Sequence, residues 1–405
     1  MGSHCTVTWR LFLSDIVPAT GPHPLQELFA AAVRTHDRSP DSFAVKMVDS
    51  LLDIARQINA TDLHLLPTEH AGELLVHYRI DGVLHPAGTL QQSSTHLIPR
   101  LKVLAHLLTY RTDIPQEGRI RTAEAHREMR VSTFPTIHGE KGVIRFLSGS
   151  RQYLGLGDLG LPEDVRLSLQ QLLRKTTGLL LVCGPAGSGK TTTLYAAMRQ
   201  LLQESEFPRS LCTLEDPVEA LIPGVSQTQI KPDSELTYQR GLASLLRQDP
   251  EVILVGEIRD RETAAVVFQA SLTGQLVLST FHAGSAAESL SRLSDMEIEP
   301  YLLRSGLRGI LAQRLIRRCC GCPPAERETC PNCRGTGYSG RLLLCELLEP
   351  ELSGLGRAIL NRDDADQIQR LAMESGMISL KQRARQALEQ GLTTPEEVAR
   401  VLGSV

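Results

Sequence analysis

The segment Gly184-Pro185-Ala186-Gly187-Ser188-Gly189-Lys190-Thr191 has the G-x-x-x-x-G-K-T spacing of a phosphate-binding loop. It follows an apolar run at 179–183 and precedes a helix-compatible run at 192–202. Glycines let the backbone wrap around a phosphate chain, while backbone N–H groups and the helix N-terminus supply partial positive charge. In this pattern the lysine reaches the β and γ phosphates and the threonine hydroxyl group holds Mg²⁺. We therefore predict that ATP and Mg²⁺ bind here, with Thr191 as the Mg²⁺ ligand, through Gly184, Pro185, Ala186, Gly187, Ser188, Gly189, Lys190, Thr191 and Thr192.

Three side chains follow other apolar runs. Hydrolysis needs an acid near the metal and a group that orients or deprotonates water. Glu215 follows the run 211–214, Glu257 follows the run 252–255, and His282 follows the run 276–280. The carboxyl ends of parallel strands face the crevice where a phosphate loop lies. We therefore expect all three side chains to reach the site of Lys190.

Cysteines form a second group. The chain has nine, and five of them lie between Cys319 and Cys333. In a long chain without a signal peptide, such crowding favours metal over disulfides. Cys319-x-x-Cys322 and Cys330-x-x-Cys333 are separated by seven residues, so two short turns can supply four thiolates to tetrahedral Zn²⁺. A four-cysteine site has no open position for water, and its role would be structural.

The elements that position these groups are predicted from the apolar pattern. From 161 to 318, short all-apolar runs alternate with helix-compatible ones, as a parallel sheet covered on both faces requires. The region 74–84 indicates a strand, an Asp-Gly turn and a strand, within a smaller α+β domain. The predicted order is a short N-terminal segment (1–41), an α+β domain (42–150), a hinge linker (151–160), an α/β core (161–318), the cysteine segment (319–340) and a helical C-terminal region (341–405).

The ordered motifs resemble the ATPases of type II secretion and type IV pilus assembly. After the phosphate loop come an acidic box at 213–219, an atypical Walker B stretch at 247–260 and a histidine box at 278–282. The resemblance extends from about Phe43 to Val401, and the N-terminal domain carries it at 78–84, 115–119 and 139–141. It implies a homo-hexameric ring in which each subunit pairs a small N-terminal domain with a RecA-like P-loop motor domain, nucleotide lying between the two.

The resemblance also implies roles for the site residues. Glu215 would be the base that activates water, Glu257 the Walker B acid near Mg²⁺, and His282 the sensor of the γ phosphate. Arginines would complete the nucleotide site, because a planar guanidinium group suits developing phosphate charge. The matching positions are Arg130 and Arg145 in the N-terminal domain and Arg247 and Arg259 in the motor domain.

The sequence departs from the family pattern in places. Many members carry a second arginine where this chain has Ala243, and Phe281 replaces the usual leucine before the histidine. The family register would also make Cys320 the first zinc ligand, while the C-x-x-C spacing favours Cys319, which we take as the prediction. Zinc cysteines are typical of assembly and secretion members rather than of retraction members.

The predicted function is ATP hydrolysis that drives pilin or pseudopilin assembly, or protein secretion, in the cytoplasm against an inner-membrane platform protein. One alternative is a nucleotide-binding scaffold subunit that has lost turnover. A second is a DNA-uptake motor, which the formal net charge of −3 disfavours because it supplies no global basic field. No apolar run reaches the roughly 18 residues that span a bilayer, so membrane association would be peripheral.

Overall fold

The computed structural model describes residues 24–35, 40–91, 96–121, 128–146, 155–204, 209–231, 235–351 and 354–403. It divides into two compact units: Met1–Gly118, Val131–Ile144 and Gly321–Gly337 form one, and Arg119–Arg130, Arg145–Cys320 and Tyr338–Val405 form the other. The predicted N-terminal segment and hinge lie partly outside the described residues.

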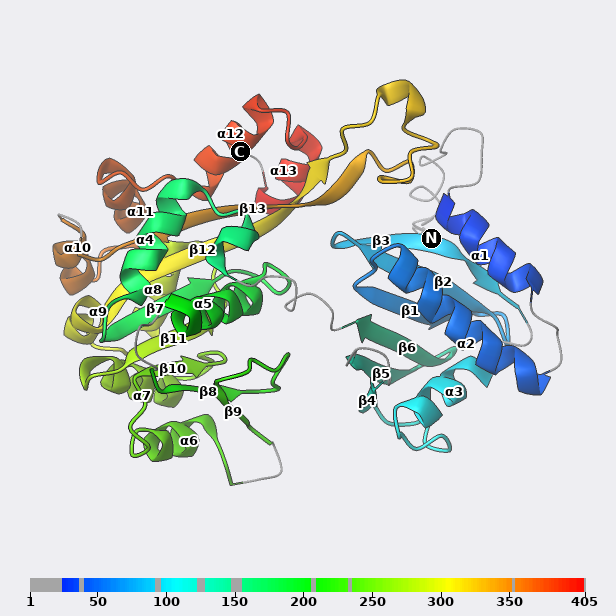
Figure 1. The fold of residues 1–405 in the computed structure, drawn as a ribbon, viewed down its shortest axis with the longest axis horizontal. Coiled ribbons are helices and arrows are strands. Elements are labelled where there is room, and N and C mark those ends of the chain that lie inside the picture. The colour runs from blue at the N-terminus through cyan, green and yellow to red at the C-terminus, as the bar shows by residue number, and fades with distance from the viewer. Residues whose placement is uncertain are drawn as a thin grey trace, which may run out of the picture. The chain divides into compact units, whose positions relative to one another are not determined.

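One sheet has six strands in the order β3-β2-β1-β6-β5-β4 (Figure 1). Its strands and the helices beside it are α1 (Pro24–Thr35), α2 (Pro40–Gln57), β1 (Asp62–Pro67), β2 (Leu74–Ile80), β3 (Val83–Leu90), α3 (Leu97–Leu104), β4 (Gln116–Arg121), β5 (Glu128–Thr136) and β6 (Gly139–Phe146). The predicted hairpin is present: Asp81 and Gly82 join β2 to β3 with φ values of 48° and 84°. The buried Tyr78 hydroxyl group donates to the carbonyl oxygen of Leu51 (3.0 Å) and fixes α2 on this sheet.

The second sheet has seven strands in the order β13-β12-β7-β11-β10-β8-β9. Its strands are β7 (Gly178–Cys183), β8 (Leu211–Glu215), β9 (Ser226–Gln229), β10 (Val252–Val255), β11 (Leu276–Phe281), β12 (Leu307–Cys319) and β13 (Tyr338–Leu348). All neighbours pair in parallel except β12 and β13, which are antiparallel. The predicted alternation of buried strands with helices is confirmed, and the four apolar runs form β7, β8, β10 and β11.

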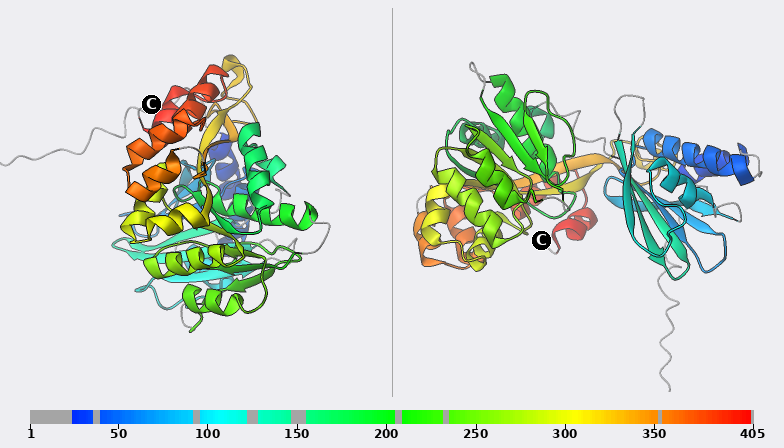
Figure 2. Two further views of the ribbon diagram at one scale, coloured as in Figure 1. Left: turned by 90° about the vertical axis from the view of Figure 1, so that its left-hand side faces the viewer. Right: turned by 90° about the horizontal axis from the view of Figure 1, so that it is seen from below.

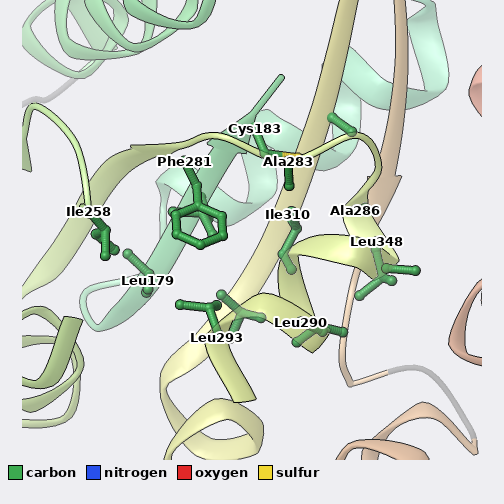
Figure 3. Close-up of a cluster of buried hydrophobic side chains, with 14 of the residues drawn as sticks. Leu179, Cys183, Ile258, Phe281, Ala283, Ala286, Leu290, Leu293, Ile310 and Leu348 are labelled. Atoms are coloured by element: carbon green, nitrogen blue, oxygen red, sulfur yellow. The ribbon is translucent and has the colours of Figure 1, made fainter. Parts of the chain in front are cut away.

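Helices cover both faces of this sheet because alternate residues of each strand enter different cores. Leu180 and Val182 of β7 pack with α4 (Glu163–Leu173) and α5 (Lys190–Glu204). Leu179 and Leu181 point into the larger core, which takes side chains from α6 (Tyr238–Leu245), α7 (Arg261–Leu272), α8 (Ala286–Asp295) and α9 (Pro300–Gly306). Figure 3 shows Cys183 and Phe281, the last residues of β7 and β11, within that core. The loops that follow β7 and β11 therefore begin at residues that are held in the core.

The C-terminal region differs from the expectation. Residues 341–348 belong to strand β13 rather than to a helical region, and helices follow only from α10 (Leu355–Asn361) through α11 (Ala365–Glu374), α12 (Leu380–Glu389) and α13 (Pro395–Leu402). In Figures 1 and 2 these helices are orange to red, and α12 packs on β13 while α13 packs on β12. The cysteine segment is thus the connection of a long antiparallel hairpin. No helix within the described ranges combines the length and apolarity needed to cross a bilayer.

Candidate functional site

The predicted phosphate loop, referred to below as the phosphate loop, joins the end of β7 to the start of α5. Gly184 has a φ of 152°, and a Cβ atom there would lie 2.5 Å from the Ser188 hydroxyl oxygen and 2.6 Å from the Gln313 carbonyl oxygen. Only glycine fits so close an approach. The buried Lys190 ammonium group donates to the carbonyl oxygens of Gly184 (2.8 Å) and Pro185 (3.0 Å). The loop is therefore a tight cradle that positions Lys190 at the first turn of α5, with Thr191 exposed beside it.

The carboxyl ends of four parallel strands meet at one edge, as predicted. Val255 of β10 pairs with Leu214 of β8 and with Ser279 of β11, while Thr280 pairs with Val182 of β7. The phosphate loop, Glu215, Glu257 and His282 follow or end these strands, so all four reach the same edge. Burial lowers the pKa of Lys190, and the charge of Glu257 opposes that shift, which places the two groups in one electrostatic environment.

Glu215 ends β8 with its carboxylate almost fully buried. Its Oε1 atom accepts hydrogen bonds from the Thr213 hydroxyl group (2.6 Å) and the Gln227 amide group (3.2 Å). Its Oε2 atom accepts from the hydroxyl group of Tyr195, which in turn accepts from the backbone N–H group of Glu219 (3.1 Å). The network leaves one lone pair of Oε2 without a donor among the described residues and fixes the carboxylate against α5.

Glu257 follows β10, and its carboxylate lies close to the side chains of Arg259 and His282. The Arg259 guanidinium group pairs with the Glu257 carboxylate and lies 3.8 Å from an oxygen of Asp216. The His282 Nε2 atom lies 3.5 Å from the Glu257 Oε2 atom. Burial lowers the pKa of His282, and the Lys190 charge lowers it further, which favours the neutral imidazole. The guanidinium group of Arg292 donates to the His282 carbonyl oxygen and holds this loop to α8.

The four predicted arginines are placed differently. Arg259 lies among the carboxylates of the site. Arg247 donates to the carbonyl oxygen of Ala243 in the preceding helical turn (3.0 Å), and the structure does not bring it to those carboxylates. Arg130 and Arg145 lie on β5 and β6 of the six-stranded sheet, and their approach to a nucleotide stays a prediction.

The cysteine segment brings four thiols together, with one correction to the predicted set. The Sγ atoms of Cys320, Cys322, Cys330 and Cys333 all lie within 4.8 Å of one another, and those of Cys322 and Cys333 are 3.6 Å apart. Cys319 is outside this cluster because it belongs to β12: it is paired with Tyr338, and its N–H group donates to the Leu392 carbonyl oxygen. Cys320, the first residue beyond the strand, takes its place.

Several residues of the site carry no motif signal in the sequence. Tyr195 and Gln227 contact Glu215 from α5 and β9, and only the folded chain reveals this. Thr213 is different: it lies two residues before Glu215 on the same strand, and strand alternation puts both side chains on one face. Tyr238 is the first residue of α6, and the charges of Asp216, Glu257 and Glu215 act on its hydroxyl group.

Comparisons with known proteins agree with this arrangement. The family model described as "Type II/IV secretion system protein" matches residues 37–400. The chain is 40% identical over 380 residues to type II secretion system protein HxcR of Pseudomonas aeruginosa, covering 91% of this chain and 78% of that protein. It is 36% identical over 395 residues to type IV pilus assembly ATPase TfpB of Acinetobacter baylyi, covering 89% of this chain and 66% of that protein.

A solved structure shares the fold. The crystal structure of the pilus retraction motor PilT with bound ADP superposes with a TM-score of 0.61 at 25% identity, over 86% of this chain and 93% of that one. The family model spans most of the sequence, including the phosphate loop, the acidic strand ends and the cysteine cluster. The chain therefore belongs to the type II/IV secretion system protein family.

Proposed function

We propose that the chain hydrolyses ATP to ADP and phosphate and thereby drives pilin or pseudopilin assembly, or protein secretion. The observation that carries this proposal is the meeting of the phosphate loop with Glu215, Glu257 and His282 at one sheet edge. A phosphate loop alone supports nucleotide binding, while acidic side chains beside it support ATP hydrolysis. The names of the relatives, a secretion protein and a pilus assembly ATPase, support the process that is driven.

The roles follow from the geometry. The loop's N–H groups and Lys190 would hold the phosphates, and the tight backbone turn at Gly184 supports this role. Thr191 and Glu257 would hold Mg²⁺, which neutralises charge on the β and γ phosphates when bound. Glu215 would take the proton of the attacking water, and His282 would contact the γ phosphate. Arg259 lies where it can offset charge that develops in the transition state.

The assembly that we propose is a homo-hexamer on the cytoplasmic side of the inner membrane, held there by a platform protein. Arg130, Arg145 and Arg247 would then complete the nucleotide site within the ring. The proposal of peripheral attachment rests on the family and on the absence of an apolar span among the described helices.

The first test is phosphate release by the full chain with ATP and Mg²⁺. Replacing Glu257 with glutamine removes the charge of the proposed metal acid, and we expect turnover to fall about 100-fold or more. Glu251 offers a matched control because it precedes β10 and Glu257 follows it, so the two acids lie at opposite ends of one strand. Glu251→Gln should leave the rate unchanged. A chain that binds ATP but releases no phosphate would instead be the scaffold subunit.

We also propose that Cys320, Cys322, Cys330 and Cys333 bind one structural Zn²⁺. The 3.6 Å between two of the thiol sulfur atoms fits tetrahedral coordination, in which Zn–S distances of about 2.3 Å put sulfur atoms about 3.8 Å apart. No disulfide joins the described cysteines, so none competes with this role. Zinc cysteines also favour assembly or secretion over retraction.

Adjacent cysteines make a sharp test of the zinc ligands. We expect Cys320→Ser to lose bound zinc and Cys319→Ser to keep about one zinc per chain, because only Cys320 lies in the cluster. Elemental analysis of the purified full-length variants measures this directly, without reference to turnover. Loss of zinc from Cys319→Ser with retention in Cys320→Ser would refute the assignment.

A further inference from the structure

The hydroxyl group of Tyr238, beside the candidate site, has no role in the function proposed above. Tyr238 is the first residue of α6. The Thr237 hydroxyl oxygen accepts a hydrogen bond from the N–H group of Arg240 (3.3 Å) and fixes the start of this helix. The Tyr238 ring packs against the larger core of its unit. Its hydroxyl oxygen is buried and has no hydrogen-bond partner among the described residues. Leaving a buried hydroxyl group without a hydrogen-bond partner destabilises the fold, so its placement here needs an explanation.

The hydroxyl group lies directly against the end of β10. A Cβ atom built on Gly256 would be 2.9 Å from the Tyr238 hydroxyl oxygen and 3.4 Å from the Cα atom of Glu215. The Gly256 N–H group donates to the Leu214 carbonyl oxygen (2.8 Å), which fixes that backbone beside β8. Gly256 immediately precedes Glu257, and its backbone lies against that of Glu215, so the hydroxyl group packs against the backbone that carries both acids.

The charges around Tyr238 define what its hydroxyl group can do. Burial raises the pKa of Tyr238, and the carboxylates of Asp216 and Glu257 raise it further, while Arg259 opposes them. The phenol therefore stays protonated at neutral pH and offers an O–H donor together with oxygen lone pairs. Protein carboxylates lie close by, yet none accepts its proton in a hydrogen bond.

A comparison within the site shows that this is unusual. The Tyr195 hydroxyl group donates to Glu215 and accepts from the backbone N–H groups of Glu219 (3.1 Å) and Ala220 (3.4 Å). That tyrosine is fully used in building the site. Tyr238 belongs to another helix, the charges of Asp216, Glu257 and Glu215 act on it, and its hydroxyl group has no hydrogen-bond partner among the described residues.

We propose that the Tyr238 hydroxyl group is a catalytic group that donates a hydrogen bond to the water molecule attacking the γ phosphate of ATP. This inference rests on the proposed ATPase function. The attacking water uses one lone pair to form the new P–O bond and gives a proton to a carboxylate, while the bond from the γ phosphorus to ADP breaks and its electron pair leaves with ADP. The second lone pair of the water is free to accept from Tyr238, and this orients the nucleophile.

The test is Tyr238→Phe in the full chain, which removes only the hydroxyl group. We expect kcat for phosphate release to fall about tenfold, with KM for ATP and the affinity for ADP within twofold of their original values. Since the lost group is unpaired in the fold, amide hydrogen exchange within α6 should stay the same or become slower. If Tyr238 had a merely structural role, its replacement would lower stability and would not change kcat alone. Tyr301→Phe, at a 60% exposed tyrosine of α9, is the matched control.

The outcomes separate this inference from the function on which it rests. If the unsubstituted chain hydrolyses ATP and Tyr238→Phe has a kcat within twofold of it, the assignment of Tyr238 is wrong and the ATPase stands. A loss of ADP or ATP affinity at unchanged kcat also overturns it, because the hydroxyl group would then contact the nucleotide rather than the water. If the unsubstituted chain releases no phosphate at all, the proposed function itself fails.

Discussion

Replacing Lys190 with alanine is expected to reduce phosphate release by the full chain at least about 100-fold, since removing one preorganised donor from a transition-state site typically costs two to three powers of ten. The ammonium group is buried at the first turn of α5, where burial lowers its pKa. Nearby negative charge favours the protonated form, so a bound triphosphate and Lys190 would stabilise each other's charge. Steady-state phosphate release and the affinity for ATP measure the two consequences.

Lys175, which lies before β7, offers a control for this substitution. Lys175 precedes β7 as Lys190 follows it, and its ammonium group forms an exposed ion pair with Glu351 (3.1 Å). Exposed pairs contribute about 0–1 kcal/mol, so Lys175→Ala should keep both the fold and the rate. A Lys190→Ala variant that keeps a third or more of the original rate would show that phosphate is released at another site.

Much of the seven-stranded sheet could be predicted because four of its strands are short and almost wholly apolar. The runs that became β7, β8, β10 and β11 are bounded by turn residues and separated by helix-compatible sequence, a pattern that a two-sided parallel sheet requires. The topology then placed Lys190, Glu215, Glu257 and His282 at one edge without any knowledge of distances.

The antiparallel edge of the sheet could not be predicted in the same way. Residues 342–348 are mostly leucine, and a short apolar run of this kind is compatible with a buried helix or a buried strand. Pairing with β12 decides between them, and β12 itself mixes arginines with apolar residues. That pairing also explains why spacing alone selected Cys319: the C-x-x-C pattern carries no information on where a strand ends.

Side chains that act through tertiary contact were equally hidden. Tyr195 lies five residues after Lys190, at a position where a helix pattern asks only for an apolar side chain, and its contact with Glu215 arises from the packing of α5 on the sheet. Tyr238 follows an ordinary helix cap. Sequence motifs identify the residues expected to contact phosphate. The residues that position these side chains, or that lie beside them, come from other helices and strands and carry no motif.

The second large effect is expected at Glu397, a carboxylate with no exposed side-chain surface in α13. Its oxygens accept from the Arg317 N–H group and guanidinium Nε atom (both 2.9 Å) and from the Arg400 Nε atom (2.8 Å). Removing one member of a buried ionic cluster leaves the rest uncompensated, so Glu397→Gln should destabilise the docking of α13 on β12 by about 3 kcal/mol. Amide hydrogen exchange within α13 should therefore become about 100-fold faster. Exchange in one helix is the suitable measurement because a chain of two units need not unfold in a single step.

The pH dependence identifies the charge as the cause. Burial favours the neutral form of Glu397, but hydrogen bonds from Arg400 and Arg317 outweigh it and hold its pKa at about 2. A carboxylate whose pKa is depressed by folding stabilises the fold above its unfolded pKa of about 4.3, and that contribution is lost as the pH falls toward the folded value. Protection of α13 in the original chain should thus decrease between about pH 4.5 and pH 2, while Glu397→Gln should show no such decrease. Glu396→Gln, at the exposed neighbour, should behave like the original chain. Equal acid sensitivity in all three proteins would mean that other carboxylates hold the C-terminal helices in place. The end of β12, after which the cysteine cluster begins, would then not depend on the ion pairs of Glu397 with Arg317 and Arg400.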